Sequence, residues 1–213
     1  MITGESFLGL KVIKSLKVQD TLLVVAQGSV LAFEGQTIVN AANEGCLGGG
    51  GVDGAITSAG GKALQVARRA LPVLDAKQTR CFTGDAVCTI GGDLPHEWCI
   101  HAVGPNYRMK GIPQGDKLLS SAYTAVMREA KTKAMTSVGF SLLSAGVFRG
   151  EQTLSKVFQI AIETVAADVY PEMQYAFLCA YTDEEVAELE QAFEAFGKKP
   201  SQGSGDIGGY RRI

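Results

Sequence analysis

The chain has 213 residues, of which 46% are hydrophobic and 20% charged, and its formal net charge is −2. This composition is typical of a globular domain with one core, and it excludes a disordered chain and a general nucleic-acid-binding surface. No apolar run reaches the ~20 residues of a membrane span. Five scattered cysteines favour buried thiols in a reducing compartment over a disulfide framework.

Hydrophobic periodicity predicts strands that alternate with helices along the chain. The predicted strands cover residues 11–18 (an edge strand), 21–26, 37–41, 97–103, 137–143 and 175–181. The first predicted helix starts near Asp53. Further helices are predicted at residues 61–71, 116–134, 154–169 and 183–196. This order predicts an α/β fold, a three-layer α/β/α sandwich with a mixed, mostly parallel sheet. Residues 1–198 form the predicted domain, and the polar, glycine-rich residues 199–213 a flexible tail.

A glycine-rich segment, IVNAANEGCLGGGGVDGAITSAGG, covers residues 38–61. It leaves a predicted strand and enters a predicted helix, so unpaired backbone N–H groups and a positive helix end are available to an anion. No Lys-Ser or Lys-Thr follows the glycines, which excludes a P-loop. No acidic residue ends a second strand about 20 residues later, which disfavours a nicotinamide-dependent oxidoreductase. The alternative is a tight turn that only needs glycine.

A second glycine-bearing loop, Ser144 to Phe148, follows another predicted strand. Ligands of such sheets bind beyond the carboxyl ends of the strands. Two facing loops could therefore hold a diphosphate with backbone N–H groups and without a basic side chain. On its own, Gly146 would indicate a simple strand-to-helix turn, and only the first glycine loop beside it favours the diphosphate site.

Three segments together resemble the macrodomain, an ADP-ribose-binding α/β module. These are NAAN…GGGGVDGAI, residues 81–105 (CFTGDAVCTIGGDLPHEWCIHAVGP) and residues 144–148 (SAGVF). The four glycines followed by Val52 and Asp53 resemble the MacroD-type branch, whose members remove mono-ADP-ribose from protein carboxylates. The three segments follow the family order over most of the chain.

The resemblance implies specific site residues. Asp53 and Asn43 are the expected catalytic residues, with Asn43 on the distal ribose. The expected ADP-ribose contacts are Ser29, Val30, Asn40, Gly48, Gly49, Gly50, Gly51, Val52, Ser144, Ala145, Gly146, Val147, Phe148 and Tyr181. Simpler alternatives are a loop amide bonding its own backbone for Asn43, a helix N-cap for Asp53, and core packing for Phe148 and Tyr181.

Asp53 is the one carboxylate of the motif that we expect to face the ligand, since the adjacent Glu44 is expected to point elsewhere. A helix N-terminus favours the charged carboxylate, which is a weak base at pH 7. Sugar hydrolysis normally uses two carboxylates. We therefore expect Asp53 to orient a water molecule and stabilise charge, with a ligand phosphate oxygen sharing the proton transfer.

The chain departs from the family pattern in two places. The family has Gly-Asp-Ile-Thr before the NAAN strand, and that Asp accepts from the adenine amino group. Here the segment is Gln27-Gly28-Ser29-Val30-Leu31, and a hydroxyl replaces the carboxylate. In the second loop Arg149 follows Phe148, where many relatives have Gly-Phe-Pro. Arg149 could add a phosphate contact, but we expect it to be solvated.

No metal or cofactor is predicted. A zinc site built from Cys88, His96, Cys99 and His101 is disfavoured because these residues lack the usual paired ligand spacing. The expected function is hydrolysis of the ester that links mono-ADP-ribose to acidic side chains, extended to O-acetyl-ADP-ribose. The rival is a reader module that binds ADP-ribose without turnover. We expect a monomer in the cytoplasm or nucleus, with the mitochondrion left open, and neither membrane nor nucleic acid as a partner.

Overall fold

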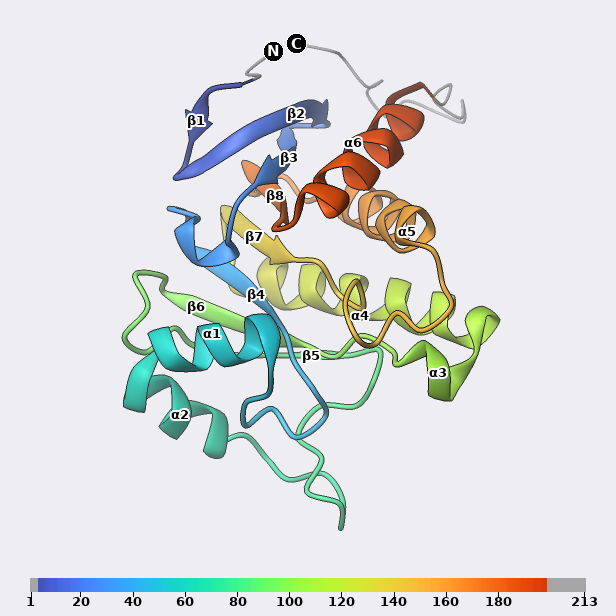
Figure 1. Cartoon of the computed structure of the whole chain (residues 1–213). Helices are drawn as coiled ribbons and strands as arrows, with labels where there is room; N and C mark the ends of the chain where they lie inside the picture. Colours follow the sequence, from blue (N-terminus) through green and yellow to red (C-terminus); the bar gives the residue numbers. More distant parts are fainter. Residues whose placement is uncertain (1–3, 199–213) are drawn as a thin grey trace.

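Residues 4–198 are described by a computed structural model, in which helices cover both faces of an eight-stranded sheet (Figure 1). The strands are β1 (Ser6–Phe7), β2 (Leu10–Val18), β3 (Thr21–Gln27), β4 (Thr37–Ala41), β5 (Ala86–Ile90), β6 (Trp98–Ala102), β7 (Ser137–Ser141) and β8 (Tyr175–Ala180). The helices are α1 (Gly51–Ala59), α2 (Gly61–Arg69), α3 (Tyr107–Lys110), α4 (Ile112–Thr132), α5 (Leu154–Ala167) and α6 (Asp183–Lys198), and a 3-10 helix covers Val30–Ala32.

Across the sheet the strands lie in the order β1-β2-β3-β8-β7-β4-β6-β5. The inner strands β3, β8, β7, β4 and β6 run parallel to one another, whereas β2 and β5 pair antiparallel with β3 and β6, and β1 pairs antiparallel with β2. The predicted mixed, mostly parallel sheet is therefore confirmed. Because parallel strands share an orientation, the loops after β3, β8, β7, β4 and β6 meet at one edge of the sheet.

Buried side chains of the central strands alternate between two cores. In β3, Leu23 and Val25 belong to the core that contains α4, α5 and α6. Val24 and Ala26 belong to the opposite core, which includes Ile56 of α1 and Leu64 of α2. A strand buried on both faces needs a helical layer on each side. Figure 1 shows α1 and α2 apart from the α4, α5 and α6 layer. The predicted three-layer sandwich is confirmed.

The predicted elements are present, with shifted ends. The helix predicted from Asp116 begins at Ile112, because Pro113 is accepted in the first turn, where no N–H donor is needed. Helix α1 begins at Gly51, two residues before the predicted start. Strand β2 pairs with the two-residue β1 only through Leu10 and Lys11, so most of β2 has the predicted edge position. The sequence did not predict β1, β5 or α3.

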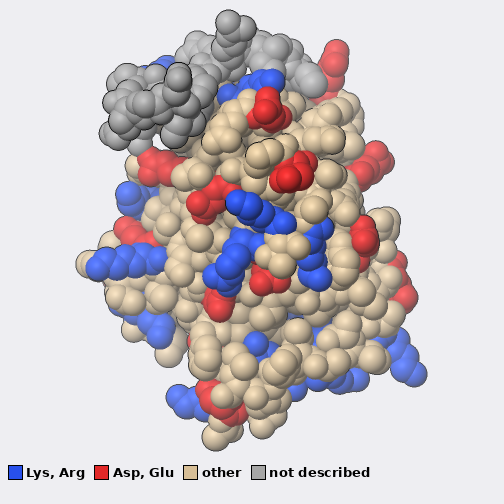
Figure 2. All heavy atoms as spheres, turned by 180° about the vertical axis from the view of Figure 1, so that it is seen from behind, with Lys and Arg blue, Asp and Glu red and all other residues tan. Residues whose placement is uncertain are grey.

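The predicted flexible tail, residues 199–213, lies outside the described residues. Within residues 4–198, no helix is long and apolar enough to cross a membrane. On the face turned away from the viewer in Figure 1, acidic and basic side chains are interspersed (Figure 2). That mixture agrees with the small net charge of −2.

Candidate active site

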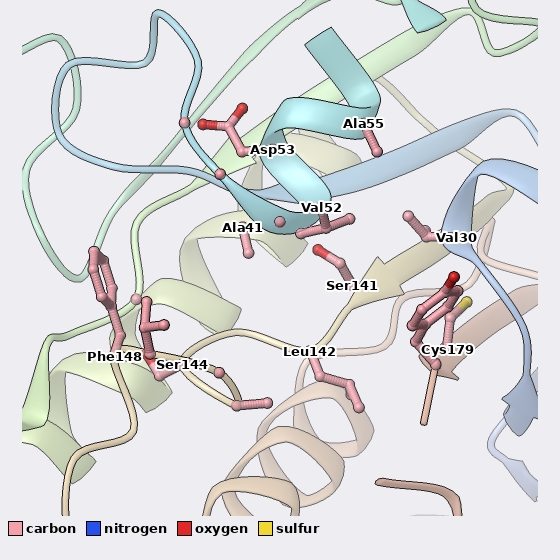
Figure 3. A pocket seen from close by; sticks show the side chains of 18 of the residues that line it. Val30, Ala41, Val52, Asp53, Ala55, Ser141, Leu142, Ser144, Phe148 and Cys179 are labelled. Atoms are coloured by element: carbon pink, nitrogen blue, oxygen red, sulfur yellow. The ribbon is translucent and has the colours of Figure 1, made fainter. Parts of the chain in front are cut away.

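A cavity of about 740 Å³ lies at the edge of the sheet where the parallel strands end (Figure 3). Its lining comes from the segments that follow β3, β8, β7 and β4, and from Gly104 after β6. Ligand sites of α/β sheets are found in this position, and the volume is typical of a small-molecule site. Two of the predicted loops form its walls.

The first wall is the glycine segment between β4 and α1. Gly50 is the N-cap of α1 and no side chain caps this helix, so its first N–H groups have no partner within the helix. Gly50, Gly51 and Val52 line the cavity. Gly51 has φ of +60°, a conformation that favours glycine. The positive end of α1 therefore faces the cavity, as the sequence predicted.

The second wall is the loop after β7. Among the described residues, the N–H groups from Ala145 to Phe148 donate to no backbone carbonyl. Ser144 has φ of +56°, and its Oγ donates to the Pro105 carbonyl at 2.8 Å. Gly104 leaves room for this hydroxyl, because a Cβ there would lie 2.4 Å from it. No Lys or Arg of the described chain lines the cavity. Backbone donors are therefore what an anion would meet there.

Asp53 lies at one end of the cavity, and its carboxylate is held by a buried cation. Its Oδ1 lies 2.8 Å from Nη2 of Arg68, and the side chains are 3% and 1% exposed. Oδ1 also accepts from Nδ2 of Asn40 at 2.8 Å. Oδ2 is buried and has no hydrogen-bond partner within the described chain. It lies beneath Gly49, where a Cβ would come within 3.0 Å of it. One carboxylate oxygen is therefore engaged and the other is uncommitted.

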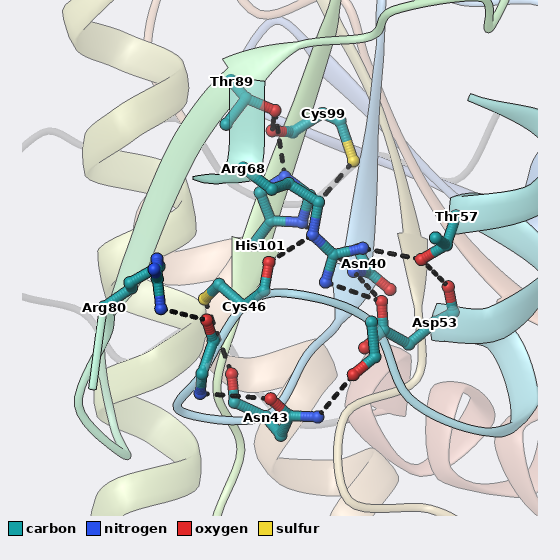
Figure 4. Close-up of polar contacts among 12 residues, drawn as sticks. Asn40, Asn43, Cys46, Asp53, Thr57, Arg68, Arg80, Thr89, Cys99 and His101 are labelled. Carbon is teal, nitrogen blue, oxygen red and sulfur yellow. Dashed lines mark hydrogen bonds and ion pairs between the residues drawn. The ribbon is translucent and has the colours of Figure 1, made fainter. Parts of the chain in front are cut away.

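Arg68 comes from α2 and is held by neighbouring groups (Figure 4). Its Nε donates to the carbonyl of Cys46, and its Nη1 donates to Oγ1 of Thr57 at 2.8 Å. Thr57 Oγ1 in turn donates to the Asp53 carbonyl at 2.7 Å. The guanidinium thus joins the loop before the glycines to the first two helices. The sequence did not predict this residue as part of the site.

Asn40 extends the network to His101. Its amide carries two hydrogens, one for Asp53 Oδ1 and one for His101 Nδ1 at 3.1 Å. Nδ1 is then an acceptor, so Nε2 carries the proton and donates to Thr89 Oγ1, 2.9 Å away. This assignment requires a neutral imidazole. Burial, aided by the charge of Arg68, lowers the pKa of His101 to about 3.

Stability is expected to fall as the pH is lowered from 7 to 5. The pKa of His101 is about 3 in the folded chain and ~6.5 when unfolded, so the unfolded state binds more protons below about pH 6.5. The contribution of His101 to the free energy of unfolding is therefore complete above pH 6.5 and is lost as the pH falls towards 3. For this group alone, the free energy of unfolding should fall by about 2 kcal/mol between pH 7 and pH 5. Urea unfolding at a series of pH values measures it.

The control for this prediction is a pair of histidine variants. His101→Gln should show a flatter pH dependence than the wild type. His96→Gln should keep the His101 contribution, because His96 contacts the Phe33 carbonyl on a separate part of the fold. A loss between pH 7 and pH 5 that is equally large in His101→Gln would contradict the assignment.

Asn40 and Gly48, two of the predicted ligand contacts, do not line the cavity in this structure. Asn40 is fully buried and its amide is used by Asp53 and His101, so it does not reach the cavity. Gly48 does not line the cavity, and its carbonyl accepts from Asn43 Nδ2 at 2.9 Å. Asn43 does line the cavity, but its Oδ1 accepts from Gly45 N at 3.1 Å. In this structure its amide bonds the loop backbone, the simpler alternative, and its ligand role stays a prediction.

The other predicted contact residues all line the cavity. The core-packing alternative is wrong for Tyr181, which is 74% exposed, and Phe148 is half-buried and lies outside the core clusters. Ser29 Oγ accepts from Leu31 N at 3.3 Å and so caps the 3-10 helix. Glu44 points elsewhere as predicted, because it accepts from Thr83.

Arg149 has a local partner: its Nη1 donates to the Gln152 carbonyl at 2.9 Å, and it does not line the cavity. Glu185, which the sequence analysis did not single out, does line the cavity. The sequence contains one signal that involves Glu185, namely Thr182 followed three residues later by Glu185. That pattern predicts a helix capping box and does not predict a ligand contact.

The cysteines are all unpaired, and four of them are buried while Cys88 is half-buried. Burial raises the pKa of Cys88 and Cys179 to about 12, so these thiols are protonated at neutral pH. Within residues 4–198, no group of three or more His, Cys, Asp or Glu side chains could hold a metal ion. The residues of the disfavoured zinc hypothesis instead bond neighbouring protein groups, as His96 and His101 show.

Comparisons with known proteins agree with this architecture. The family model described as Macro domain matches residues 39–158. A macro domain-containing protein in the gbd 3′ region of Cupriavidus necator is 40% identical over 163 residues, 76% of this chain and 91% of that protein. The O-acetyl-ADP-ribose deacetylase of Escherichia coli (strain K12) is 40% identical over 173 residues, 79% of this chain and 93% of that enzyme.

Solved structures give the same result. An Oceanobacillus iheyensis macrodomain with ADP matches with a TM-score of 0.78 and 26% identity, over 86% of this chain and 95% of that chain. A Trypanosoma brucei macrodomain in complex with ADP-ribose matches with a TM-score of 0.67 and 28% identity, over 80% of this chain and 68% of that chain. The chain therefore belongs to the Macro domain family, and its resemblance to the MacroD-type branch is confirmed.

Proposed function

We propose that this protein binds ADP-ribose in the cavity and hydrolyses an ester on its distal ribose. The substrates are proteins mono-ADP-ribosylated on Asp or Glu, and O-acetyl-ADP-ribose. The observation that carries the proposal is the pairing of two backbone-donor walls with a carboxylate at one end of the same cavity. Relatives named as O-acetyl-ADP-ribose deacetylases, and a related structure in complex with ADP-ribose, support it.

The walls suit a diphosphate. The N-terminus of α1 and the loop from Ser144 to Phe148 supply N–H groups that favour an anion between them. Glycines at positions 49–51 let phosphate oxygens approach the backbone closely. With the diphosphate there, we place the distal ribose at the end of the cavity where Figure 3 shows Phe148 and Asp53.

Asp53 supplies the chemistry at that ribose. Hydrolysis adds the hydroxyl of water to the acyl group and a proton to the ribose oxygen, while the ester bond between them breaks. Since Oδ1 is engaged by Arg68 and Asn40, Oδ2 is the oxygen available to orient the water. A ligand phosphate oxygen shares the proton transfer. Arg68 keeps the carboxylate fixed, and preorganised charge of this kind is effective in a site that excludes water.

A reader module is the second candidate. The observation in its favour is that the Asp53 side chain is only 3% exposed and already forms an ion pair. A buried, paired carboxylate can be purely structural. Binding and turnover must therefore be measured separately.

Two measurements test the proposal on the wild-type protein. Calorimetry with ADP-ribose should show binding at one site. Incubation with O-acetyl-ADP-ribose, and with a protein mono-ADP-ribosylated on Glu, should release ADP-ribose in amounts that grow with time. Binding without release would identify a reader module. Absence of binding at millimolar ADP-ribose would overturn the whole proposal.

A further inference from the structure

The cavity carries acidic side chains at two separate places. Within the described chain, Asp53 and Glu185 are the only charged residues that line it. Asp53 follows β4 and Glu185 follows β8, and β7 lies between these strands in the sheet. Figure 3 shows Val30 and Cys179, which belong to the β3 and β8 side, away from Phe148 and Asp53. The two carboxylates therefore belong to opposite ends of the cavity, with the loop after β7 between them.

This arrangement constrains how a dinucleotide-like anion lies. Phosphates are repelled by both carboxylates and find no cationic side chain in the lining, so they belong at the backbone donors in the middle. Each carboxylate then needs a hydrogen-bond donor of the ligand. At the Asp53 end these are sugar hydroxyls, which leaves the base at the Glu185 end.

Glu185 is held in a defined position there. Its Oε2 accepts from Tyr181 N at 2.8 Å and from Thr182 N at 3.0 Å. Its own N–H donates to Thr182 Oγ1 at 3.1 Å, which completes a capping box at the start of α6. Among the described residues, no hydrogen bond engages Oε1. The half-buried Glu185 thus presents one fixed, charged acceptor.

The neighbours of Glu185 fit a base. Tyr181 is 74% exposed and lines the cavity, so its ring offers an aromatic face for stacking. The hydroxyl of Ser29, which follows β3 and also lines the cavity, is neutral and already caps the 3-10 helix. Glu185 is therefore the only charged acceptor available to a base in the described lining.

We propose that Oε1 of Glu185 accepts a hydrogen bond from the exocyclic amine of adenine and selects a 6-amino purine over a 6-oxo purine. This inference rests on the proposed function, because it assumes that the cavity takes ADP-ribose. A 6-oxo group would place its lone pairs against the carboxylate. A charge-assisted bond is stronger than a neutral one, so the discrimination is set by the charge of this residue.

The experiment compares the affinity for ADP-ribose with that for its inosine counterpart, which has hypoxanthine in place of adenine. The wild type should bind ADP-ribose at least about tenfold more tightly. In Glu185→Gln the amide oxygen still caps α6, so the NH2 group replaces Oε1 at the base. This group donates to a 6-oxo group and cannot accept from a 6-amino group. The inosine counterpart should then bind at least as tightly as ADP-ribose. Glu184→Gln removes an exposed charge from the same helical turn, outside the cavity lining, and should keep the wild-type ratio.

The outcomes separate this inference from the proposed function. If the wild type binds ADP-ribose and Glu185→Gln keeps the wild-type ratio, Glu185 does not read the base while ADP-ribose binding stands. If Glu185→Gln weakens both ligands equally, Glu185 contacts the sugar, and the inference is again overturned. If the wild type binds neither ligand, both proposals fail. Thermal unfolding of each variant confirms that the compared proteins are folded.

Discussion

Asp53→Asn is expected to slow the release of ADP-ribose from its distal ester by about 10²–10³-fold. The amide keeps the shape of the carboxylate, and its oxygen can still accept from Arg68 and Asn40. It cannot carry the negative charge that orients the water and stabilises the transition state. Affinity for ADP-ribose should change by less than about tenfold, since the diphosphate contacts are backbone groups. Single-turnover kinetics and calorimetry measure the two effects.

The matched control for Asp53→Asn is Glu44→Gln. Glu44 is an exposed carboxylate of the same loop, and it bonds Thr83 outside the cavity. Its charge should therefore be dispensable for turnover. Wild-type release by a folded Asp53→Asn variant would sink the catalytic role of Asp53. Asp53→Ala is a poorer test, because it also removes the oxygen that accepts from the buried Arg68 and Asn40, and so adds a larger loss of stability to the lost chemistry.

Arg68→Leu is expected to lower the free energy of unfolding by about 3–5 kcal/mol. The substitution leaves the Asp53 carboxylate charged, buried and without its cation. It also removes the donors to the Cys46 carbonyl and to Thr57 Oγ1. Removing one partner of a buried ion pair costs more than the pair itself contributes, because the remaining charge stays desolvated. Urea unfolding at pH 7 measures the loss.

Arg69→Leu is the matched control, because it removes an arginine from the same end of α2 that does not belong to the buried ion pair. Arg69 is the next residue of α2 and is exposed, so its replacement should change stability by less than about 0.5 kcal/mol. The double variant Asp53→Asn, Arg68→Leu should recover part of the loss, since no buried charge is stranded. A double-mutant cycle gives the coupling energy of the pair. A cost below about 1 kcal/mol for Arg68→Leu would mean that the ion pair does not hold Asp53 in place.

Local patterns in the sequence predicted the fold well where hydrophobic periodicity was strong. The strand at residues 37–41 and the stripe of Leu119, Tyr123 and Val126 on α4 appear as expected, because burial repeats with the period of each element. Strand β5 was missed. It is short, partly exposed and terminated by Gly91 and Gly92, and its strand conformation depends on pairing with β6. The connection to β6, residues 91–97, is too long to give the two-residue turn motif that marks a tight hairpin.

The glycine loops, the two catalytic candidates and the family were determined by the sequence alone, because they depend on residue types at fixed spacing within one loop. The tertiary structure decided the rest. It turned Asn40 inwards to His101, brought Arg68 of α2 onto Asp53, and placed Glu185, which caps α6, in the lining of the cavity. The physical reason is that each of these contacts joins separate elements. The direction of a buried side chain follows from how those elements pack, and periodicity within one element does not contain that information.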